Sequence, residues 1–436
     1  MNRETKLDIS QFTPIPEAGY LVGGAVRDAL LGREFSDIDW LVAEPAEAAR
    51  RAALELGGHV FALDEDRGHW RVMAGEVSRD YIHPEGDLET DLRRRDFTCN
   101  ALAATLDGLL IDPCGGLEDL KRKRVRMVSR EVLEQDPVRL LRGVRLAINL
   151  EFGFDPATRE AIRDCAEAQR KSRLALPAWE RSRDELDKIL QSPWAGRGMQ
   201  LLDHLGILDV YLPELALARG IDQGGFHHLD VLHHSFEALN QLVQGFPEAD
   251  PTLRWATLLH DLGKAQTKTY GEDGRFHFYG HDKVGAELAQ SLLKRLRQPN
   301  DITERTAALV RYHMLPLPKD DRSARRFVHR RRTLLPDLLK LMIADREAAR
   351  GPLSSEATRR PYRLALARII KLLEEAPPKP PLLDGKEVMD LLGLAQSPRI
   401  GEALRFIHEA EAVGDITNKG EAEAALQHFA KRQGWI

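Results

Sequence analysis

The sequence contains little cysteine, and the cysteines it has form no pairing pattern. Its 436 residues include three cysteines, Cys99, Cys114 and Cys165, with no CxxC pair among them. A small, odd number of this kind argues for free thiols in a reducing compartment. We therefore expect Cys99 and Cys114 to serve as small buried hydrophobic residues.

Signals for secretion and for membrane insertion are also missing. The first ten residues, MNRETKLDIS, are polar and contain no apolar signal core. No apolar run approaches the roughly 20 residues that are needed to span a bilayer. These absences lead us to expect no membrane association and a cytoplasmic location.

The composition is that of a soluble globular protein with several domains. Hydrophobic residues make up 43% of the chain and charged residues 30%, and the length suits two to four domains. With 63 Lys and Arg against 68 Asp and Glu, the net charge is −5. This acidic excess neither points to nucleic acid nor excludes it, because binding depends on where the charge lies.

Strand and helix patterns alternate in the first part of the chain, and helical patterns fill the rest. Strands are predicted at Tyr20–Val22, Ile38–Val42, His59–Leu63, Trp70–Val77 and Ala103–Ile111, and helices at Val26–Leu31 and Ala46–Leu56. From Asp136 onward, leucine and alanine recur at three- and four-residue spacing. A proline-rich stretch at Pro377–Pro381 predicts a semi-rigid linker. The fold class is therefore α+β and multidomain: an α/β head over residues 1–135, an all-α neck over 136–222, a histidine-rich helical domain over 223–375 and a helical tail over 376–436.

Two aspartates, Asp37 and Asp39, form the first chemical constellation. Strand side chains alternate, so both carboxylates point to the same face. Neighbouring carboxylates are stable together when they share hard cations such as Mg²⁺, which phosphoryl transfer requires. Upstream, the Gly23-Gly24 turn between a strand and a helix brings backbone N–H groups toward an anion such as phosphate. Taken singly, these features also fit a solvated strand end and a plain tight turn.

The combination of G-G-x-V-R-D and D-I-D resembles the nucleotidyltransferase signature of the polymerase β superfamily. The match is to the version found in bacterial CCA-adding enzymes and poly(A) polymerases of class II. Residues 94–101, RRDFTCNA, are similar to the family's RRDFTxNA element. The resemblance implies a polymerase-β-like head that binds Mg²⁺ through its two aspartates and transfers nucleotides from CTP or ATP to the 3′ acceptor end of tRNA. It also implies nucleotide-binding roles for Gly24, Arg27 and Arg95 at the triphosphate and for Asp96 at the ribose hydroxyl.

A helix start at residues 135–145 carries a second set of charged residues. Asp136 and Arg139 are three residues apart and share a helix face, which Arg142 and Arg145 extend. By itself this pattern also fits an exposed, ion-paired helix. The family resemblance implies that Asp136 and Arg139 mimic the Watson–Crick partner of a base and select C and A, while Arg142 and Arg145 position base or phosphate. The family usually has Glu where this chain has Gln135, and no role is implied for that residue.

Histidines and aspartates gather in the middle of the chain. Their order, H…HD…H…H…D, resembles the HD superfamily of metal-dependent phosphohydrolases, and it implies a second site for a divalent metal at His234, His260, Asp261, His281, His313 and Asp345. Buried His and Asp need partners, and a metal supplies them. Two interpretations stay open: a site that hydrolyses phosphoesters such as a 2′,3′-cyclic phosphate, and a structural or inactive metal site.

Three other segments resemble parts of the same family or suggest RNA contact. Glu180, Arg181 and Glu185 resemble an element that supports the neck, and the segment LLDGKEVMDLLGL is similar to a C-terminal helical domain that contacts the outer part of tRNA. The basic segment at residues 321–332 is a candidate for RNA backbone contact, and a solvated helix face explains it equally well.

The nucleotide choice depends on a short segment, RDYIHPEGDLETDL, at residues 79–92. Complete CCA-adding relatives usually carry a longer flexible loop there, and relatives with a deletion tend to stop after two C residues. The sequence therefore favours a CC-adding enzyme, which requires a separate A-adding enzyme, over a complete CCA-adding enzyme with accessory HD phosphohydrolase activity. Poly(A) polymerase fits less well, because residues 382–436 are not strongly basic. A phosphohydrolase with a non-catalytic RNA-binding head is disfavoured, because Asp37 and Asp39 are both present.

Overall fold

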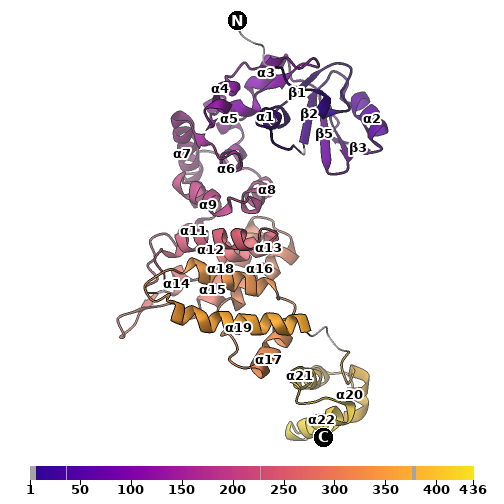
Figure 1. Cartoon of the computed structure of the whole chain (residues 1–436), viewed down its shortest axis with the longest axis vertical. Helices are drawn as coiled ribbons and strands as arrows, with labels where there is room; N and C mark the ends of the chain where they lie inside the picture. The colour runs from indigo at the N-terminus through magenta and orange to yellow at the C-terminus, as the bar shows by residue number, and fades with distance from the viewer. Residues whose placement is uncertain (1–5, 36, 226, 376–379) are drawn as a thin grey trace. The chain divides into compact units, whose positions relative to one another are not determined.

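The chain forms two compact units in a computed structural model that describes residues 6–35, 37–225, 227–375 and 380–436 (Figure 1). The first unit comprises Met1–Ala216 with Arg295–Gln298, and the second comprises Leu217–Lys294 with Pro299–Ile436. The linker predicted at Pro377–Pro381 lies mostly outside the described residues. Where the chain is described, no helix has both the length and the apolar character that crossing a membrane would take.

A seven-stranded sheet organises the start of the first unit. Its order is β3-β4-β5-β2-β1-β6-β7, with β2 and β5 parallel and the other neighbours antiparallel. Parallel pairing needs a long crossover, which α2 and the β3–β4 hairpin supply. The strands are β1 (Tyr20–Val22), β2 (Asp37–Leu41), β3 (His59–Asp64), β4 (His69–Ala74), β5 (Val77–Ile82), β6 (Ala103–Ala104) and β7 (Leu110–Ile111).

Two of the predicted strands are wrong in extent, because each contains a turn. The strand predicted at Trp70–Val77 ends at Ala74, where Gly75 adopts a φ of 64° and the chain reverses into β5. The strand predicted at Ala103–Ile111 is likewise split by Gly108, with a φ of 86°, into β6 and β7. Glycine tolerates positive φ at little cost, so one glycine helps to reverse the chain within each of the connections 75–76 and 105–109, and the apolar pattern gives little sign of either turn.

The first unit also contains the helices that carry the neck. Its 3₁₀ helices are η1 (Ser10–Phe12) and η2 (Thr98–Asn100), and its short parallel strands are β8 (Arg124–Val125) and β9 (Gly153–Phe154). Its α-helices are α1 (Gly24–Leu30), α2 (Pro45–Leu56), α3 (Leu88–Arg93), α4 (Gly116–Lys121), α5 (Arg130–Gln135), α6 (Val138–Leu150), α7 (Pro156–Arg170), α8 (Trp179–Gln191), α9 (Ala195–His204), α10 (Leu208–Tyr211) and α11 (Pro213–Ala216).

The segment predicted as one helix start at residues 135–145 is two helices. Helix α5 ends at Gln135, Asp136 has the non-helical angles φ −136° and ψ 88°, and Pro137 precedes the first residue of α6. The residue before a proline is pushed out of the helical region by the proline ring. Asp136 is therefore held at a bend between helices rather than on the helical face that carries Arg139.

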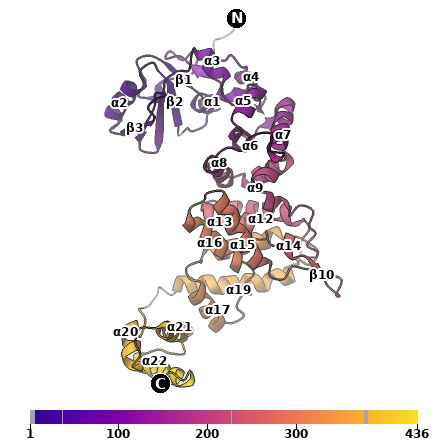
Figure 2. The same ribbon diagram turned by 180° about the vertical axis from the view of Figure 1, so that it is seen from behind.

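The second unit is helical apart from one small hairpin, β10 (Thr269–Tyr270) with β11 (Phe276–His277) (Figure 2). Helix α12 packs against α18, and α13 against α16. The tail helices have a core of their own, which includes Val388, Ile407 and Leu426. The α-helices are α12 (Val231–Gly245), α13 (Pro251–Leu259), α14 (Lys264–Thr267), α15 (His281–Arg295), α16 (Asn300–Tyr312), α17 (Asp321–Arg331), α18 (Asp337–Ala348), α19 (Glu356–Glu375), α20 (Gly385–Leu392), α21 (Pro398–Val413) and α22 (Lys419–Arg432).

The three cysteines are free thiols, as their number predicts. Cys99 and Cys165 are buried, whereas Cys114 is half-buried. Burial raises the pKa of the Cys99 thiol to about 12, so it stays protonated near neutral pH and acts as a small apolar side chain. The prediction of burial is confirmed for Cys99 and is wrong for Cys114.

Helix α6 packs closely against the head at Gly143. Phe97 is fully buried, and a Cβ added to Gly143 of α6 would lie 2.6 Å from Cζ of its ring. The helix can approach the head this closely because residue 143 has no side chain. This contact fixes the distance between the head and the α6 residues that face it.

We expect Gly143→Ala to lower the free energy of unfolding by up to about 2 kcal/mol. Alanine gains roughly 1 kcal/mol of helix propensity over glycine, but overpacking against a buried ring costs about 1–3 kcal/mol. The measurement is the urea midpoint of the full chain, with Gly153→Ala as control, since its Cβ would meet nothing within 4 Å. A midpoint for Gly143→Ala equal to or above that of the parent would show that Phe97 does not restrict the helix.

Candidate active site

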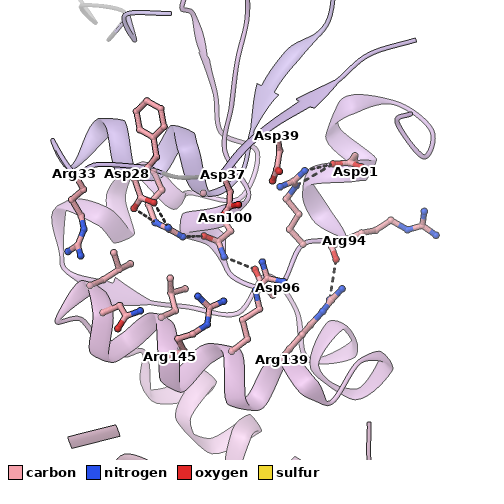
Figure 3. A pocket seen from close by; sticks show the side chains of 18 of the residues that line it. Asp28, Arg33, Asp37, Asp39, Asp91, Arg94, Asp96, Asn100, Arg139 and Arg145 are labelled. Atoms are coloured by element: carbon pink, nitrogen blue, oxygen red, sulfur yellow. Dashed lines mark hydrogen bonds and ion pairs between the residues drawn. The ribbon is translucent and has the colours of Figure 1, made fainter. Parts of the chain in front are cut away.

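The two predicted aspartates lie at one cavity in the first unit, with a volume of about 550 Å³. Asp37 and Asp39 project from β2 into it, as Figure 3 shows. In that view Arg33 and Asp28 lie on one side of Asp37, and Asp91, Arg94 and Arg139 lie on the other. The other lining residues are Gly24, Arg27, Glu34, Phe35, Glu85, Arg95, Asp96, Asn100, Arg142, Arg145, Leu146, Asn149 and Leu150.

A third carboxylate, Asp80, stands beside this pair. The parallel register places Asp80 of β5 directly opposite Asp39 of β2. Its carboxylate accepts two hydrogen bonds from Arg71, at 2.6 and 2.8 Å, and contacts His69 at 2.9 Å. Sequence reasoning missed Asp80 because it ended the strand at Val77. Val77, Tyr81 and Ile82 are residue types that favour strands, and they were the signal that could have located it.

Negative charge therefore concentrates at the centre of the cavity. Burial raises the pKa of Asp39, repulsion from Asp80 and Asp37 raises it further, and Arg95 opposes the change. A group of oxygen ligands with surplus negative charge suits a hard divalent cation. The residues present thus fit the metal that the sequence pattern implies, and Asp37 and Asp39 are the side chains that would hold it.

Gly23 allows a cation to approach this charge. It has a φ of 78°, and a Cβ there would lie 2.6 Å from Nη1 of Arg95 and 3.2 Å from Oδ2 of Asp39. Any side chain would therefore separate the guanidinium from the carboxylate. The sequence-based choice was Gly24, which begins α1 and lines the cavity, but Gly23 is the glycine that the geometry requires.

Four predicted or neighbouring residues form one chain of hydrogen bonds and an ion pair around the buried Asp96. Arg27 donates to the side-chain oxygen of Asn100, whose amide nitrogen donates to Asp96 at 2.9 Å. Asp96 in turn pairs with Nε of Arg142 at 2.9 Å. Burial opposes ionisation of Asp96, but Arg142, Asn100 and the Phe97 backbone N–H outweigh it and lower its pKa. Asp96 is therefore ionised and links the head to α6. Asn100 belongs to the same chain of contacts, and sequence reasoning missed it.

The predicted base-reading residue Arg139 is held by backbone carbonyls of the head. Arg139 donates through Nη1 to the backbone carbonyls of Arg94 and Val132, at 3.2 and 3.1 Å. Its Nε lies 3.9 Å from Oδ2 of Asp136. Arg139 lines the cavity, whereas Asp136 lies beside its described lining. The predicted pair is thus adjacent, but its carboxylate lies outside that lining.

Helix α8 supports both ends of this charged set. Arg181 donates to Asp136 at 2.7 Å, and Glu185 accepts from Nε of Arg145 at 2.6 Å. These contacts fit the supporting role that the resemblance implies for the α8 residues. Because Nε of Arg145 donates to Glu185, the remaining N–H groups of its guanidinium are those available to a ligand.

All six residues predicted as a second metal site converge in the second unit. One group consists of His234, His260 and Asp345, and the other of Asp261, His281 and His313; in each group the possible ligand atoms lie within 4.8 Å of one another. His234 contacts Asp345 at 2.9 Å. The groups adjoin, because Nε2 of His260 lies 3.2 Å from Asp261 and 3.6 Å from Asp345.

The histidine rings are oriented as metal ligands are. Nδ1 of His260, His281 and His313 bonds to the backbone carbonyl three residues earlier, at 2.8, 2.7 and 2.7 Å. A carbonyl only accepts, so Nδ1 carries the proton and the neutral ring presents its Nε2 lone pair. Nε2 of His260 is buried and has no hydrogen-bond partner among the described residues. The donor set therefore fits a divalent metal.

The negative charge of the two aspartates in this cluster also favours a bound cation. Burial lowers the pKa of His260, but Asp261 and Asp345 outweigh it and raise that pKa to about 10. A bound metal ion would take the place of this proton. Sequence reasoning missed two supporting residues: His227, whose Nδ1 lies 3.4 Å from Nδ1 of His234, and Lys264, which donates to Asp261 at 2.7 Å.

The basic segment at residues 321–332 is partly neutralised within its own unit. Arg326 and Arg330 of α17 pair with Glu409 of α21 at 2.7 and 2.6 Å, and Arg322 pairs with Asp415. These ion pairs join α17 to the tail helices. Contact of this segment with RNA stays a prediction.

Three family models match successive parts of the chain. A model of the poly A polymerase head domain matches residues 19–78 and 67–126, one of the probable RNA and SrmB-binding site of polymerase A matches 151–218, and the HD domain matches 227–350. The A-adding tRNA nucleotidyltransferase of Deinococcus radiodurans is 54% identical over 96% of this chain and 97% of that protein. The chain belongs to the tRNA nucleotidyltransferase family.

Another full-length relative of this tRNA nucleotidyltransferase has a different product. The CC-adding tRNA nucleotidyltransferase of Thermus thermophilus is 46% identical over 95% of this chain and 94% of that protein. Among solved structures, the Bacillus stearothermophilus CCA-adding enzyme in complex with CTP has a TM-score of 0.65 at 24% identity, covering 95% of this chain and 94% of that one. At that identity the structural likeness shows the fold alone.

The family assignment confirms the α+β fold class and the transferase activity expected from the sequence. The chain is a tRNA nucleotidyltransferase with a polymerase-type head and an HD domain. Nucleotidyltransferases of this family use divalent metals. In the head, such an ion would stabilise the charge that develops on the reacting phosphate, and the carboxylates of β2 are the groups that would hold it.

We expect Asp39→Asn to reduce nucleotide addition by about a thousand-fold or more. A metal ion contributes several kcal/mol of transition-state stabilisation, and about 1.4 kcal/mol corresponds to a ten-fold change in rate. The measurement is the rate of tRNA extension in the presence of Mg²⁺, with Asp66→Asn, an exposed aspartate, as control. Addition by Asp39→Asn within ten-fold of the parent, with an unchanged circular dichroism spectrum, would exclude Asp39 as a metal ligand.

We expect His260→Ala to lower the affinity of the second unit for Mn²⁺ or Co²⁺ by at least about ten-fold. Loss of residues that merely orient ligands already costs about 10–100-fold in metal affinity. The measurement is metal content by mass spectrometry after dialysis of the full chain. His428→Ala, which changes an exposed histidine of α22, should retain the parent's content. Equal metal content in all three proteins would count against a metal centre at the cluster.

Proposed function

We propose that this tRNA nucleotidyltransferase adds the two C residues of the 3′-terminal CCA sequence and stops there. Its substrates are CTP and a tRNA acceptor end, and a separate A-adding enzyme completes the sequence. The single observation that carries this proposal is the short connection, His83–Asp87, between β5 and α3. A single nucleotide pocket accepts C and then A only if a neighbouring segment changes the shape of the pocket. The connection His83–Asp87 is too short to make that change.

The short connection is shorter still than the sequence suggested. Of the segment at residues 79–92, the start belongs to β5, which ends at Ile82, and the end belongs to α3, which begins at Leu88. The connection therefore has no room for a long flexible loop beside the cavity. A pocket of fixed shape favours one base over two.

A second candidate is an A-adding enzyme, and one observation favours it. The relative named as A-adding is 54% identical to this chain, whereas the relative named as CC-adding is 46% identical. Both names describe partial addition, so both relatives support a chain that supplies one kind of nucleotide. A complete CCA-adding enzyme is the third reading, since the Multifunctional CCA protein of Pseudomonas fluorescens is 35% identical over 67% of this chain and 74% of that protein.

In the proposed mechanism, the 3′-OH of tRNA attacks the α-phosphate of the nucleotide and pyrophosphate leaves. Asp37 and Asp39 hold Mg²⁺, which when bound stabilises the charge on the transferring phosphate. Arg95 and Arg27 contact the triphosphate, since guanidinium groups fit phosphate oxygens. One solved neighbour is described as complexed with a primer tRNA and an incoming ATP analog, and another as in complex with CTP, so tRNA and CTP are each bound by a neighbour of the same fold.

The neck residues supply the choice of base in this mechanism. Arg139 reaches the cavity and offers N–H donors to the ring nitrogen and carbonyl of cytosine. Asp136, beside it, accepts from the exocyclic amine once the two residues close on a base. Arg142 holds Asp96 in its charged state, so Asp96 accepts a hydrogen bond from the ribose hydroxyl, and Arg145 positions base or phosphate.

The HD cluster supports an accessory phosphohydrolase activity on RNA ends. The observation that favours it is the convergence of all six predicted ligands, with the rings of His260, His281 and His313 oriented by backbone carbonyls. A 2′,3′-cyclic phosphate is the substrate class that such a site would clear before nucleotide addition. The opposing interpretation, a structural metal site, predicts metal without turnover of that substrate.

The test is an extension assay with the full chain, Mg²⁺ and two tRNA substrates, one lacking CCA and one ending in CC. Each receives CTP, ATP or both, and products are resolved at single-nucleotide length. We expect two C residues on the first substrate and no change in the second. Addition of A to the CC-ending tRNA alone would establish the A-adding version. Addition of all three nucleotides would overturn partial addition, and no addition at all would bring the phosphohydrolase forward as the main activity.

A further inference from the structure

The connection between β5 and α3 is fixed at both ends. The backbone N–H of His83 donates to the carbonyl of Gly68 at 3.0 Å, which ties its start to the β3–β4 turn. At its end, Asp87 caps α3 by accepting from the backbone N–H of Thr90 at 2.8 Å. A segment this short and fixed at both ends has few conformations, so the residues between the two ends have defined positions.

Glu85 lies in the middle of this connection and lines the cavity. Its Oε2 pairs with Nη1 of Arg94 at 2.7 Å. Arg94 follows the last residue of α3 and also lines the cavity. Both side chains are largely exposed, at 65% and 63%, so the pair adds little to stability. Its position at the edge of the nucleotide pocket is what makes it informative.

Arg94 joins this pair to the base-reading residue. Its backbone carbonyl accepts from Nη1 of Arg139 at 3.2 Å, and the same Nη1 also donates to the carbonyl of Val132. The orientation of the Arg139 guanidinium therefore depends on where the Arg94 backbone lies. Glu85, Arg94 and Arg139 form a continuous chain of contacts from the short connection to the group that faces the base.

We propose that Glu85 is a positioning residue for base selection: through Arg94 it fixes Arg139 in the orientation that accepts one base and rejects the other. This inference rests on the proposed function, and it names a residue that carries the effect of the short connection. Arg139 presents a fixed set of donors because the chain of contacts holds it. When the pair is broken, the Arg94 backbone moves with α3, and Arg139 tolerates a second base.

The experiment is a charge swap in the full chain, with Glu85→Arg, Arg94→Glu and the double variant. For each protein, kcat/KM is measured for CTP and for ATP on tRNA, and so is the equilibrium binding of each nucleotide. We expect each single variant to reduce the preference between the two nucleotides by about three- to ten-fold, because the contact is lost and like charges meet. The double variant restores the pairing and should return the preference to within about two-fold of the parent.

The matched control is Glu89→Arg. Glu89 pairs with Arg93 at 2.6 Å on α3, with side-chain exposures of 61% and 55%, yet neither residue is among those described as lining the cavity. This variant should leave the preference within about two-fold of the parent. A purely structural role for Glu85 would change the rates for both nucleotides equally and leave their ratio unaltered.

The outcomes separate this inference from the proposed function. If Glu85→Arg leaves the ratio for CTP and ATP at the parent's value, or if the double variant shows no rescue, the positioning role is wrong. If the parent prefers one nucleotide in the binding measurement, the single variants abolish that preference and the double variant restores it, the positioning role stands. That result would hold even if the parent adds no nucleotide to tRNA, an outcome that would overturn only the proposed function.

Discussion

The parallel pairing of β2 with β5 is the constraint on which the first unit depends. It sets Asp39 directly opposite Asp80, and with Asp37 nearby the sheet gathers three carboxylates. Such a gathering is unfavourable unless cations compensate it. Arg71 neutralises Asp80, and Gly23 leaves room for Arg95 beside Asp39. The remaining negative charge faces the cavity. The strand pairing of the sheet therefore produces a group of carboxylates that a metal ion would stabilise.

Much of this arrangement was predictable from the sequence. Short apolar strands and the spacing of Asp37 and Asp39 depend on local periodicity, and the six histidine-site residues depend on a long but ordered pattern. The misses depend on single residues or on distant partners. Gly75 and Gly108 turn the chain where the apolar pattern continues, and no local signal pairs Asp136 with Arg181.

Charged residues that a sequence assigns to ligands often turn out to bind one another. Asp96 pairs with Arg142, Arg145 pairs with Glu185, and the arginines of α17 pair with acidic residues of the tail helices. Periodicity shows that such residues share a face, but it does not show what the opposite surface carries. Residue type therefore predicted where charge gathers better than it predicted which partner each charge has.

The ring orientation in the HD cluster has a consequence for how that site tolerates change. His260, His281 and His313 are each oriented by a backbone carbonyl three residues earlier in their own segment. The orientation of each of these three rings is therefore determined locally, by its own segment of the chain. Substitution of one of these three histidines therefore leaves intact the backbone contacts that orient the other two.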